Sequence, residues 1–168
     1  MRDASHVAAN KRRLSSLWQR APWLLAFLIS ILRLTRARFT AGVVGVVCNA
    51  DGAILVVEHV FHAPETWGLP GGWMGRREAP RDALRRELHE ELGLIVSVLE
   101  PVHISQGRDT GHLDMAFLCR AQNDVQYLSG ELMDYRWVDP EALPPLPPFH
   151  RAAVDAAHDR LVREDGNV

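Results

Sequence analysis

Cysteine is scarce in this chain, and several motifs built on cysteine, serine or glycine are missing. Only Cys48 and Cys119 occur among the 168 residues, each inside an apolar run and without a CxxC spacing. We expect two reduced, buried thiols, with a Cys48–Cys119 disulfide as the alternative. No serine nucleophile elbow, P-loop or Rossmann fingerprint is present, which leaves acyl transfer and P-loop nucleotide hydrolysis without support.

Long hydrophobic runs are also lacking. The apolar run of residues 22–32 is followed by Arg33, Arg36 and Arg38, where cations suit the C-terminal end of a helix. A helix of about 13 residues over 22–34 spans roughly 20 Å, less than the roughly 30 Å of membrane hydrocarbon. The run is too short to cross a membrane, and no small-residue cleavage site of a signal peptide follows it.

Three placements of this apolar helix stay open. It packs on the rest of the protein, it is exchanged in a homodimer, or it makes a peripheral membrane contact through residues 22–34. We expect a cytoplasmic protein, with a peripheral position at the inner face of the membrane as the alternative.

The formal net charge of −2 conceals an asymmetry. Residues 1–38 contain eight Lys or Arg and one Asp, a net charge of +7, so residues 39–168 carry −9. We predict a basic N-terminal arm with an apolar helix over 1–38, and one domain over 39–168. An acidic domain suits the binding of metal cations and lacks the broad basic face of a nucleic-acid binder, so no nucleic-acid partner is expected.

From residue 39 onward, strand patterns outnumber helical ones. A hairpin is predicted from Thr40–Cys48 and Ala53–His59, because the Asn49–Gly52 cluster between them favours a turn. Further strands are predicted over Ile95–Ile104, Leu113–Ala121 and Leu132–Val138, and helices over Pro80–Leu92 and His150–Arg163. Strands and helices do not alternate strictly, which favours an α/β fold with a mixed sheet and helices on its faces.

The helix predicted over Pro80–Leu92 places its acidic residues together. At 100° per residue, Glu87, Glu90 and Glu91 lie within about 100° of one another, while Leu84 and Leu88 face the core. Like charges four residues apart repel, and a hard cation such as Mg²⁺ relieves that repulsion. The alternative for these three glutamates alone is a solvated, charged helix face.

The surrounding segment favours the metal site. Gly72, five residues, Glu78, seven residues and Arg-Glu-Leu-His-Glu-Glu-Leu-Gly-Leu follow one another up to Leu94. This segment resembles the Nudix box at every specified position, and the chain is identified as a MutT-like member of the Nudix hydrolase superfamily. The resemblance implies the Nudix α/β/α sandwich with a central mixed sheet. It also implies Mg²⁺, with Mn²⁺ as a substitute.

The resemblance assigns roles within the box. It implies that metal is bound by the Gly72 carbonyl and the carboxylates of Glu87, Glu90 and Glu91. Glu87 is also a candidate catalytic base, and Arg86 corresponds to the arginine that orients the glutamates through ion pairs. Glu78 and Gly93 correspond to structural residues, Glu78 as the acidic partner of Arg86 or an outer-sphere ligand and Gly93 as a helix cap. This chain has Arg77-Glu78-Ala79 where many relatives have Gly-Glu-Ser or Gly-Glu-Thr, so we expect different capping of the loop.

Residues outside the box are less specific. Glu131 corresponds to a loop glutamate that acts as base or extra ligand in some members, and an exposed turn residue is the alternative. Trp67, Arg108 and His112 are candidates for substrate binding. The alternative is packing for Trp67 and an ordinary polar turn for the other two.

The resemblance implies hydrolysis of a small-molecule diphosphate, a nucleoside diphosphate linked to another group. Nucleoside triphosphates, nucleotide sugars, ADP-ribose and CDP-alcohols stay open as substrates, although the downstream proline of ADP-ribose enzymes is missing. The apolar arm adds a lipid-linked or isoprenoid diphosphate at a membrane. A nucleotide-binding module without catalysis is the alternative of another class, and the presence of all four box glutamates argues against it.

Overall fold

The computed structural model describes Trp23, Phe27 and residues 40–60, 66–106 and 111–165. The chain divides into two units, Met1–Arg38 and Phe39–Val168. In the first unit, only Trp23 and Phe27 are described; both have helical backbone and exposed side chains. The rest of the apolar helix predicted over 22–34 lies outside the described residues. No helix in the described part of the chain is long and apolar enough to span a membrane.

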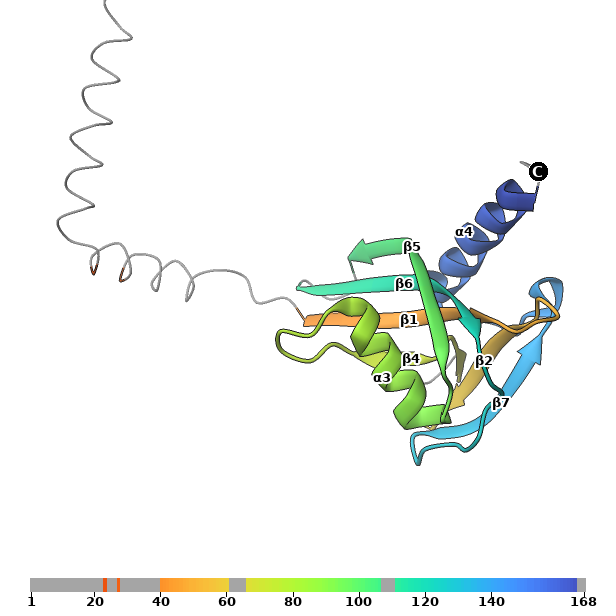
Figure 1. Cartoon of the computed structure of the whole chain (residues 1–168), viewed down its shortest axis with the longest axis horizontal. Helices are drawn as coiled ribbons and strands as arrows, with labels where there is room; N and C mark the ends of the chain where they lie inside the picture. Colours follow the sequence, from red (N-terminus) through yellow and green to blue (C-terminus); the bar gives the residue numbers. More distant parts are fainter. Residues whose placement is uncertain (1–22, 24–26, 28–39, 61–65, 107–110, 166–168) are drawn as a thin grey trace, which may run out of the picture. The chain divides into compact units, whose positions relative to one another are not determined.

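The second unit is built on one seven-stranded mixed sheet (Figure 1). Its strands are β1 (Thr40–Cys48), β2 (Ile54–His59), β3 (Trp67–Gly68), β4 (Gly71–Trp73), β5 (Val96–Gln106), β6 (His112–Ala121) and β7 (Leu132–Val138). The order is β3-β2-β1-β6-β5, with β4 paired to β1 and β7 paired to β2. The sheet contains both parallel and antiparallel pairs of strands, so the predicted mixed sheet is confirmed.

Strand β1 is central to this sheet. It pairs in parallel with β6 from Thr40–His112 to Cys48–Arg120. Its other edge pairs antiparallel with β4 over residues 42–44, and with β2 only at Cys48–Ile54. The predicted hairpin of β1 and β2 therefore pairs only beside its turn, because β4 pairs with the rest of that edge of β1 and β3 pairs with β2 farther along the strand.

Two helices cover the two faces of the sheet, α3 (Pro80–Leu92) and α4 (Pro148–Asp165) (Figure 1). Alternate residues of a strand point to opposite faces. Accordingly, Val43 and Val47 belong to the core under α3, whereas Val46 belongs to the core under α4. The Nudix-type α/β/α sandwich predicted from the sequence is confirmed in this unit.

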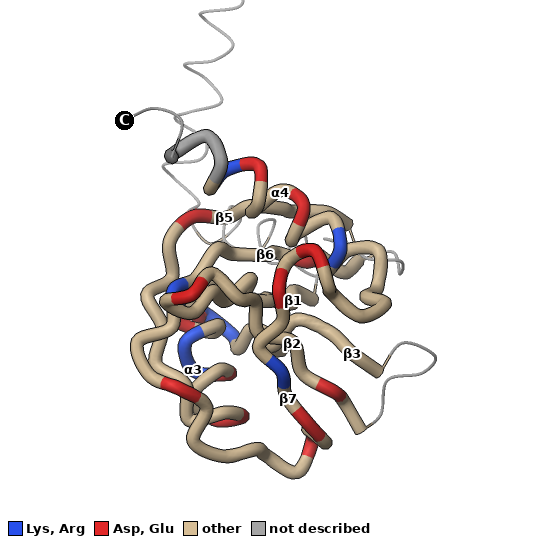
Figure 2. Tube along the Cα trace, turned by 90° about the vertical axis from the view of Figure 1, so that its right-hand side faces the viewer, with Lys and Arg blue, Asp and Glu red and all other residues tan. Residues whose placement is uncertain are grey.

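Helix α3 has the predicted bounds. Its apolar side, Leu84 and Leu88, is completely buried. Among the glutamates, Glu90 is exposed, while Glu87 and Glu91 are partly buried. Gly93 ends the helix with a φ of 61°, in the left-handed region that glycine adopts without strain. Basic and acidic residues lie next to one another along α3 (Figure 2).

Candidate active site

Arg86 is the centre of the polar network on α3. Its guanidinium donates through Nε and Nη2 to the two carboxylate oxygens of Glu78, at 2.9 and 3.0 Å. Nη1 donates to Glu87 at 2.9 Å and to Glu90 at 3.2 Å, and Nη2 also donates to the Trp73 carbonyl at 3.1 Å. One planar cation thereby joins strand β4, the following loop and two glutamates of α3.

Glu78 fixes the loop between β4 and α3. It accepts a hydrogen bond from the Gly75 backbone N–H at 2.7 Å in addition to its two from Arg86. These bonds lower the pKa of Glu78 to about 2, the Arg86 hydrogen bonds having the largest effect. Glu78 is thus an anion at any pH near neutrality, and it holds Arg86 in one orientation.

Gly72 lies directly against the carboxylate of Glu87. A Cβ at position 72 would lie 2.7 and 2.8 Å from the two Glu87 oxygens, inside van der Waals contact. The side chain of Glu87 is only 15% exposed. Glycine therefore makes room for a carboxylate beside its own backbone, and this brings the Gly72 backbone and Glu87 together as the sequence predicts.

Glu91 is the glutamate with an unusual environment. Burial has the largest effect on its pKa, and together with the nearby charges of Glu87, Glu131 and Glu90 it raises this pKa to about 7. Its Oε2 atom is buried and makes no hydrogen bond with any described residue. A buried carboxylate oxygen without a partner is costly, and a cation would offset that cost.

Glu131 lies close enough to Glu91 for its charge to affect that pKa, although its own side chain is exposed. The segment before it docks on the end of α3, and sequence patterns did not indicate this. Ser129 N–H donates to the Glu91 carbonyl at 2.8 Å, and the Tyr127 hydroxyl donates to the His89 carbonyl at 2.7 Å. The last carbonyls of a helix lack partners within it, so this segment satisfies them and brings Glu131 to the site.

The residues present fit a divalent cation. The donors are carboxylates and a backbone carbonyl, which are hard oxygen ligands, and both the unpartnered Glu91 oxygen and the space beside Gly72 suit a cation. Within the described residues, no three Asp, Glu, His or Cys side chains converge closely enough to form a complete metal site. Arg86 holds one oxygen each of Glu87 and Glu90, and the second oxygen of each carboxylate makes no bond to Arg86.

The other sequence candidates lie apart from this cluster. Trp67 is in β3, where the Arg136 guanidinium stacks over its ring at 4.4 Å from the centroid, so one face of the indole is covered. His112 begins β6, and both of its ring nitrogens are hydrogen-bonded, to Thr40 at 2.7 Å and to Asp114 at 2.9 Å. Arg108 lies outside the described residues.

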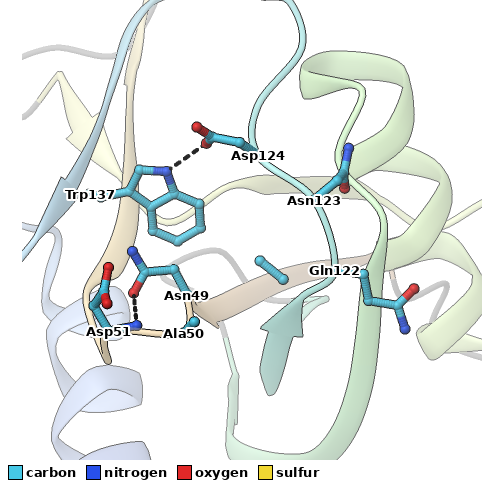
Figure 3. A pocket seen from close by; sticks show the side chains of 8 residues that line it. Asn49, Ala50, Asp51, Gln122, Asn123, Asp124 and Trp137 are labelled. Carbon is cyan, nitrogen blue, oxygen red and sulfur yellow. Dashed lines mark hydrogen bonds between the residues drawn. The ribbon is translucent and has the colours of Figure 1, made fainter.

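The described residues form two hollows, and one of them borders the site. A groove of about 320 Å³ between α3 and the start of β5 includes Arg86 and Glu90 together with Ile95. A second hollow of about 290 Å³ lies at the β1–β2 turn, where Asp124 accepts a hydrogen bond from the Trp137 indole at 2.9 Å (Figure 3). No box glutamate lines the second hollow, so it is separate from the candidate metal site.

Residues 38–158 match the NUDIX domain family model. A MutT-like protein of Streptomyces ambofaciens is 30% identical over 102 residues, which cover 61% of this chain and 65% of the relative, just under two thirds of its length. A nucleoside triphosphatase NudI of Salmonella heidelberg is 32% identical over 109 residues, covering 55% of this chain and 77% of the relative.

A solved structure agrees in fold. A MutT NUDIX hydrolase from Burkholderia pseudomallei superimposes with a TM-score of 0.60 and 26% identity, covering 71% of this chain and 98% of that protein.

Proposed function

The chain belongs to the Nudix hydrolase family, and from this premise we propose that it is a magnesium-dependent enzyme that hydrolyses a diphosphate linkage in a nucleotide-derived substrate. Nudix enzymes generally use divalent metal ions, and Mg²⁺ is the ion we propose, with Mn²⁺ as a substitute. The similar proteins are named as a MutT-like protein and a nucleoside triphosphatase, which supports a nucleoside triphosphate as the first substrate to test.

The observation that carries this proposal is the buried, unpartnered carboxylate oxygen of Glu91 beside two further glutamates. We propose that Glu87, Glu90, Glu91 and the Gly72 carbonyl hold the metal. Bound there, a divalent cation neutralises the diphosphate and polarises its phosphoryl oxygens.

The remaining groups orient these ligands and accept a proton. Arg86, held by Glu78, restricts the carboxylates of Glu87 and Glu90 to one side of α3. Water attacks one phosphorus atom, the bond to the bridging oxygen breaks, and a carboxylate takes the proton from the attacking water. Glu87 and Glu131 are the two proton acceptors that we propose, and single Gln variants of each distinguish them by the pH dependence of kcat.

The direct test is phosphate and pyrophosphate release from nucleoside triphosphates, ADP-ribose, nucleotide sugars, CDP-choline and isoprenyl diphosphates, with Mg²⁺ or with EDTA. We expect turnover that requires Mg²⁺ and falls on the order of 10²–10⁴-fold in Glu91→Gln. Glu141→Gln makes the same chemical change in the short helix η1 (Pro140–Ala142) and serves as the matched control.

Each outcome of this panel assigns a function. If the protein hydrolyses only isoprenyl diphosphates, its substrate is a lipid-linked diphosphate and not a nucleotide. Binding of nucleotides by a folded protein, without turnover of any of them, would show a binding module. Near-native activity in Glu91→Gln would reject the assigned metal site.

A further inference from the structure

Trp73 combines high exposure with a position beside the candidate metal site. Its side chain is 64% exposed, although large apolar side chains are usually more buried. It follows Gly72 directly, and its carbonyl accepts a hydrogen bond from Arg86 at 3.1 Å. The backbone of Trp73 is therefore fixed by the same guanidinium that binds Glu87.

The exposed indole has a fixed support. The rings of Trp73 and His112 lie 4.8 Å apart between centroids, tilted by 56°. His112 is itself held on both sides, with Nδ1 hydrogen-bonded to Thr40 and Nε2 to Asp114. Because both nitrogens already have partners, His112 is better suited to supporting Trp73 than to binding a substrate directly.

Gly42 makes room for this arrangement. It is the cross-strand partner of Trp73 in β4 and of Asp114 in β6, so these residues share one face of the sheet. A Cβ on Gly42 would lie 3.2 Å from the Asp114 Oδ1 atom and 3.3 Å from the His112 Nε2 atom. A larger residue would therefore press on the two groups that support the indole.

The sheet edge connects Trp73 with the glutamates. Gly72 faces Glu87 on the α3 side, so Trp73 projects to the other side of the same strand. Within the described residues, β4 pairs only with β1, and its outer edge has no neighbouring strand. In the described part of the chain, this uncovered edge lies between the face that carries the glutamates and the face that carries the indole.

We propose that the indole of Trp73 is the surface on which the aromatic base of the substrate stacks, with His112 as its positioning residue. The inference rests on the proposed function, and it names the side chain that binds the base of a nucleotide-derived substrate. An exposed, immobilised aromatic ring binds any base through its flat face, and base–aromatic stacking strengthens binding by roughly 5- to 150-fold.

The test compares two ligands that differ only in the base. Isothermal titration measures binding of AMP and of ribose 5-phosphate to the full chain with Mg²⁺. Wild type is expected to bind AMP more tightly, and Trp73→Ala to weaken AMP binding by roughly 5- to 150-fold, while ribose 5-phosphate binding changes less than about twofold. Trp73→Phe keeps an aromatic ring and should retain most of the AMP affinity.

Met133→Ala is the matched control, because Met133 is an equally exposed apolar residue at 62%. It should leave the binding of both ligands unchanged, and circular dichroism confirms that each variant is folded. Equal binding of AMP and ribose 5-phosphate by wild type, or an equal loss of both in Trp73→Ala, would overturn the stacking role. These outcomes differ from failure of the proposed function, in which wild type turns over no diphosphate at all.

Discussion

Gly71 and Gly72 are adjacent, but an added side chain would meet different groups at the two positions. At Gly72, the Cβ would meet only the end of the Glu87 side chain, which can rotate away. At Gly71, it would overlap the backbone carbonyl of Val43, and the φ of 150° is also unfavourable for other residues. Gly71 is therefore required by the fold, and Gly72 by the candidate active site.

Alanine substitutions should separate these two requirements. We expect Gly72→Ala to keep the thermal stability of wild type and to lose on the order of 10²-fold in kcat, because Glu87 is displaced by about 1 Å. Gly71→Ala should instead lower the free energy of unfolding by more than about 2 kcal/mol. Urea unfolding and steady-state kinetics on both variants check this; equal loss of stability in both would contradict it.

Single-residue roles were predictable to different degrees. The contact of Arg86 with Glu78 joins residues eight positions apart across a loop, so helical periodicity could not indicate it, and only the resemblance to the family did. The exposure of Trp73 and its contact with His112 depend on the pairing of β4 with β1 and of β1 with β6. Such pairings between distant segments are not encoded in any local pattern.

Among the elements, the start of α3 departs from the favourable pattern. Ala79 occupies the N-cap with φ and ψ of −76° and 143°, and no side chain caps the helix. Two residues earlier, Arg77 has a φ of 64°, a left-handed conformation in which a non-glycine residue is strained. The expected difference in capping is thus present in the structure. Serine or threonine at position 79 would cap the helix, and glycine at position 77 would adopt the left-handed conformation without strain.

Restoring a cap should stabilise the protein. Ala79 is exposed, and its backbone already has cap geometry, so Ala79→Ser is expected to raise the free energy of unfolding by about 0.5–2 kcal/mol. Ala79→Val adds bulk without an acceptor oxygen and is the control that should give no gain. Denaturant titrations measure the free energy of unfolding of both variants. An equal gain in Ala79→Val would show that the missing cap is not the cause.

Element boundaries were well predicted where end signals exist. Pro80 and Gly93 mark the ends of α3, and its prediction needed no correction. The short strands β3 and β4 were not predicted, because two or three residues that include glycine are too few to give an alternating pattern. The predicted β1–β2 hairpin is confirmed beside its turn, but its short extent was not predictable, since the turn signal at Asn49–Gly52 says nothing about which strand occupies the remaining edge.

At the scale of the whole molecule, Glu91 couples folding to pH. Its pKa is about 7 in the folded protein, against the ordinary value of 4.5 for a glutamate, so between these pH values the folded state binds a proton that the unfolded state has lost. Stability from this group is present below about pH 4.5 and is lost as the pH rises towards 7. Ionised Glu91 therefore opposes folding of the metal-free protein.

Metal-free wild type should accordingly lose about 1–2 kcal/mol of unfolding free energy between pH 5 and pH 8, a value reduced for partial solvent exposure. Glu91→Gln should abolish most of that loss, whereas Glu90→Gln, whose position is 59% exposed, should not. Mg²⁺ should stabilise wild type more at pH 8 than at pH 6, because binding requires the carboxylate. A pH dependence that Glu91→Gln leaves unchanged, measured by urea unfolding in EDTA, would contradict this coupling.

Strands β1 and β6 pair in parallel, but the ribosome synthesises them at different times. Thr40 and His112 contact each other across 72 positions of sequence, so β1 leaves the ribosome long before its partner exists. Helix α3, with Glu87, Glu90 and Glu91, is made during that interval, before β6 has joined β1 or β5. The ligands of the metal are thus among the earlier residues made, but they are fixed in place only after β6 has emerged.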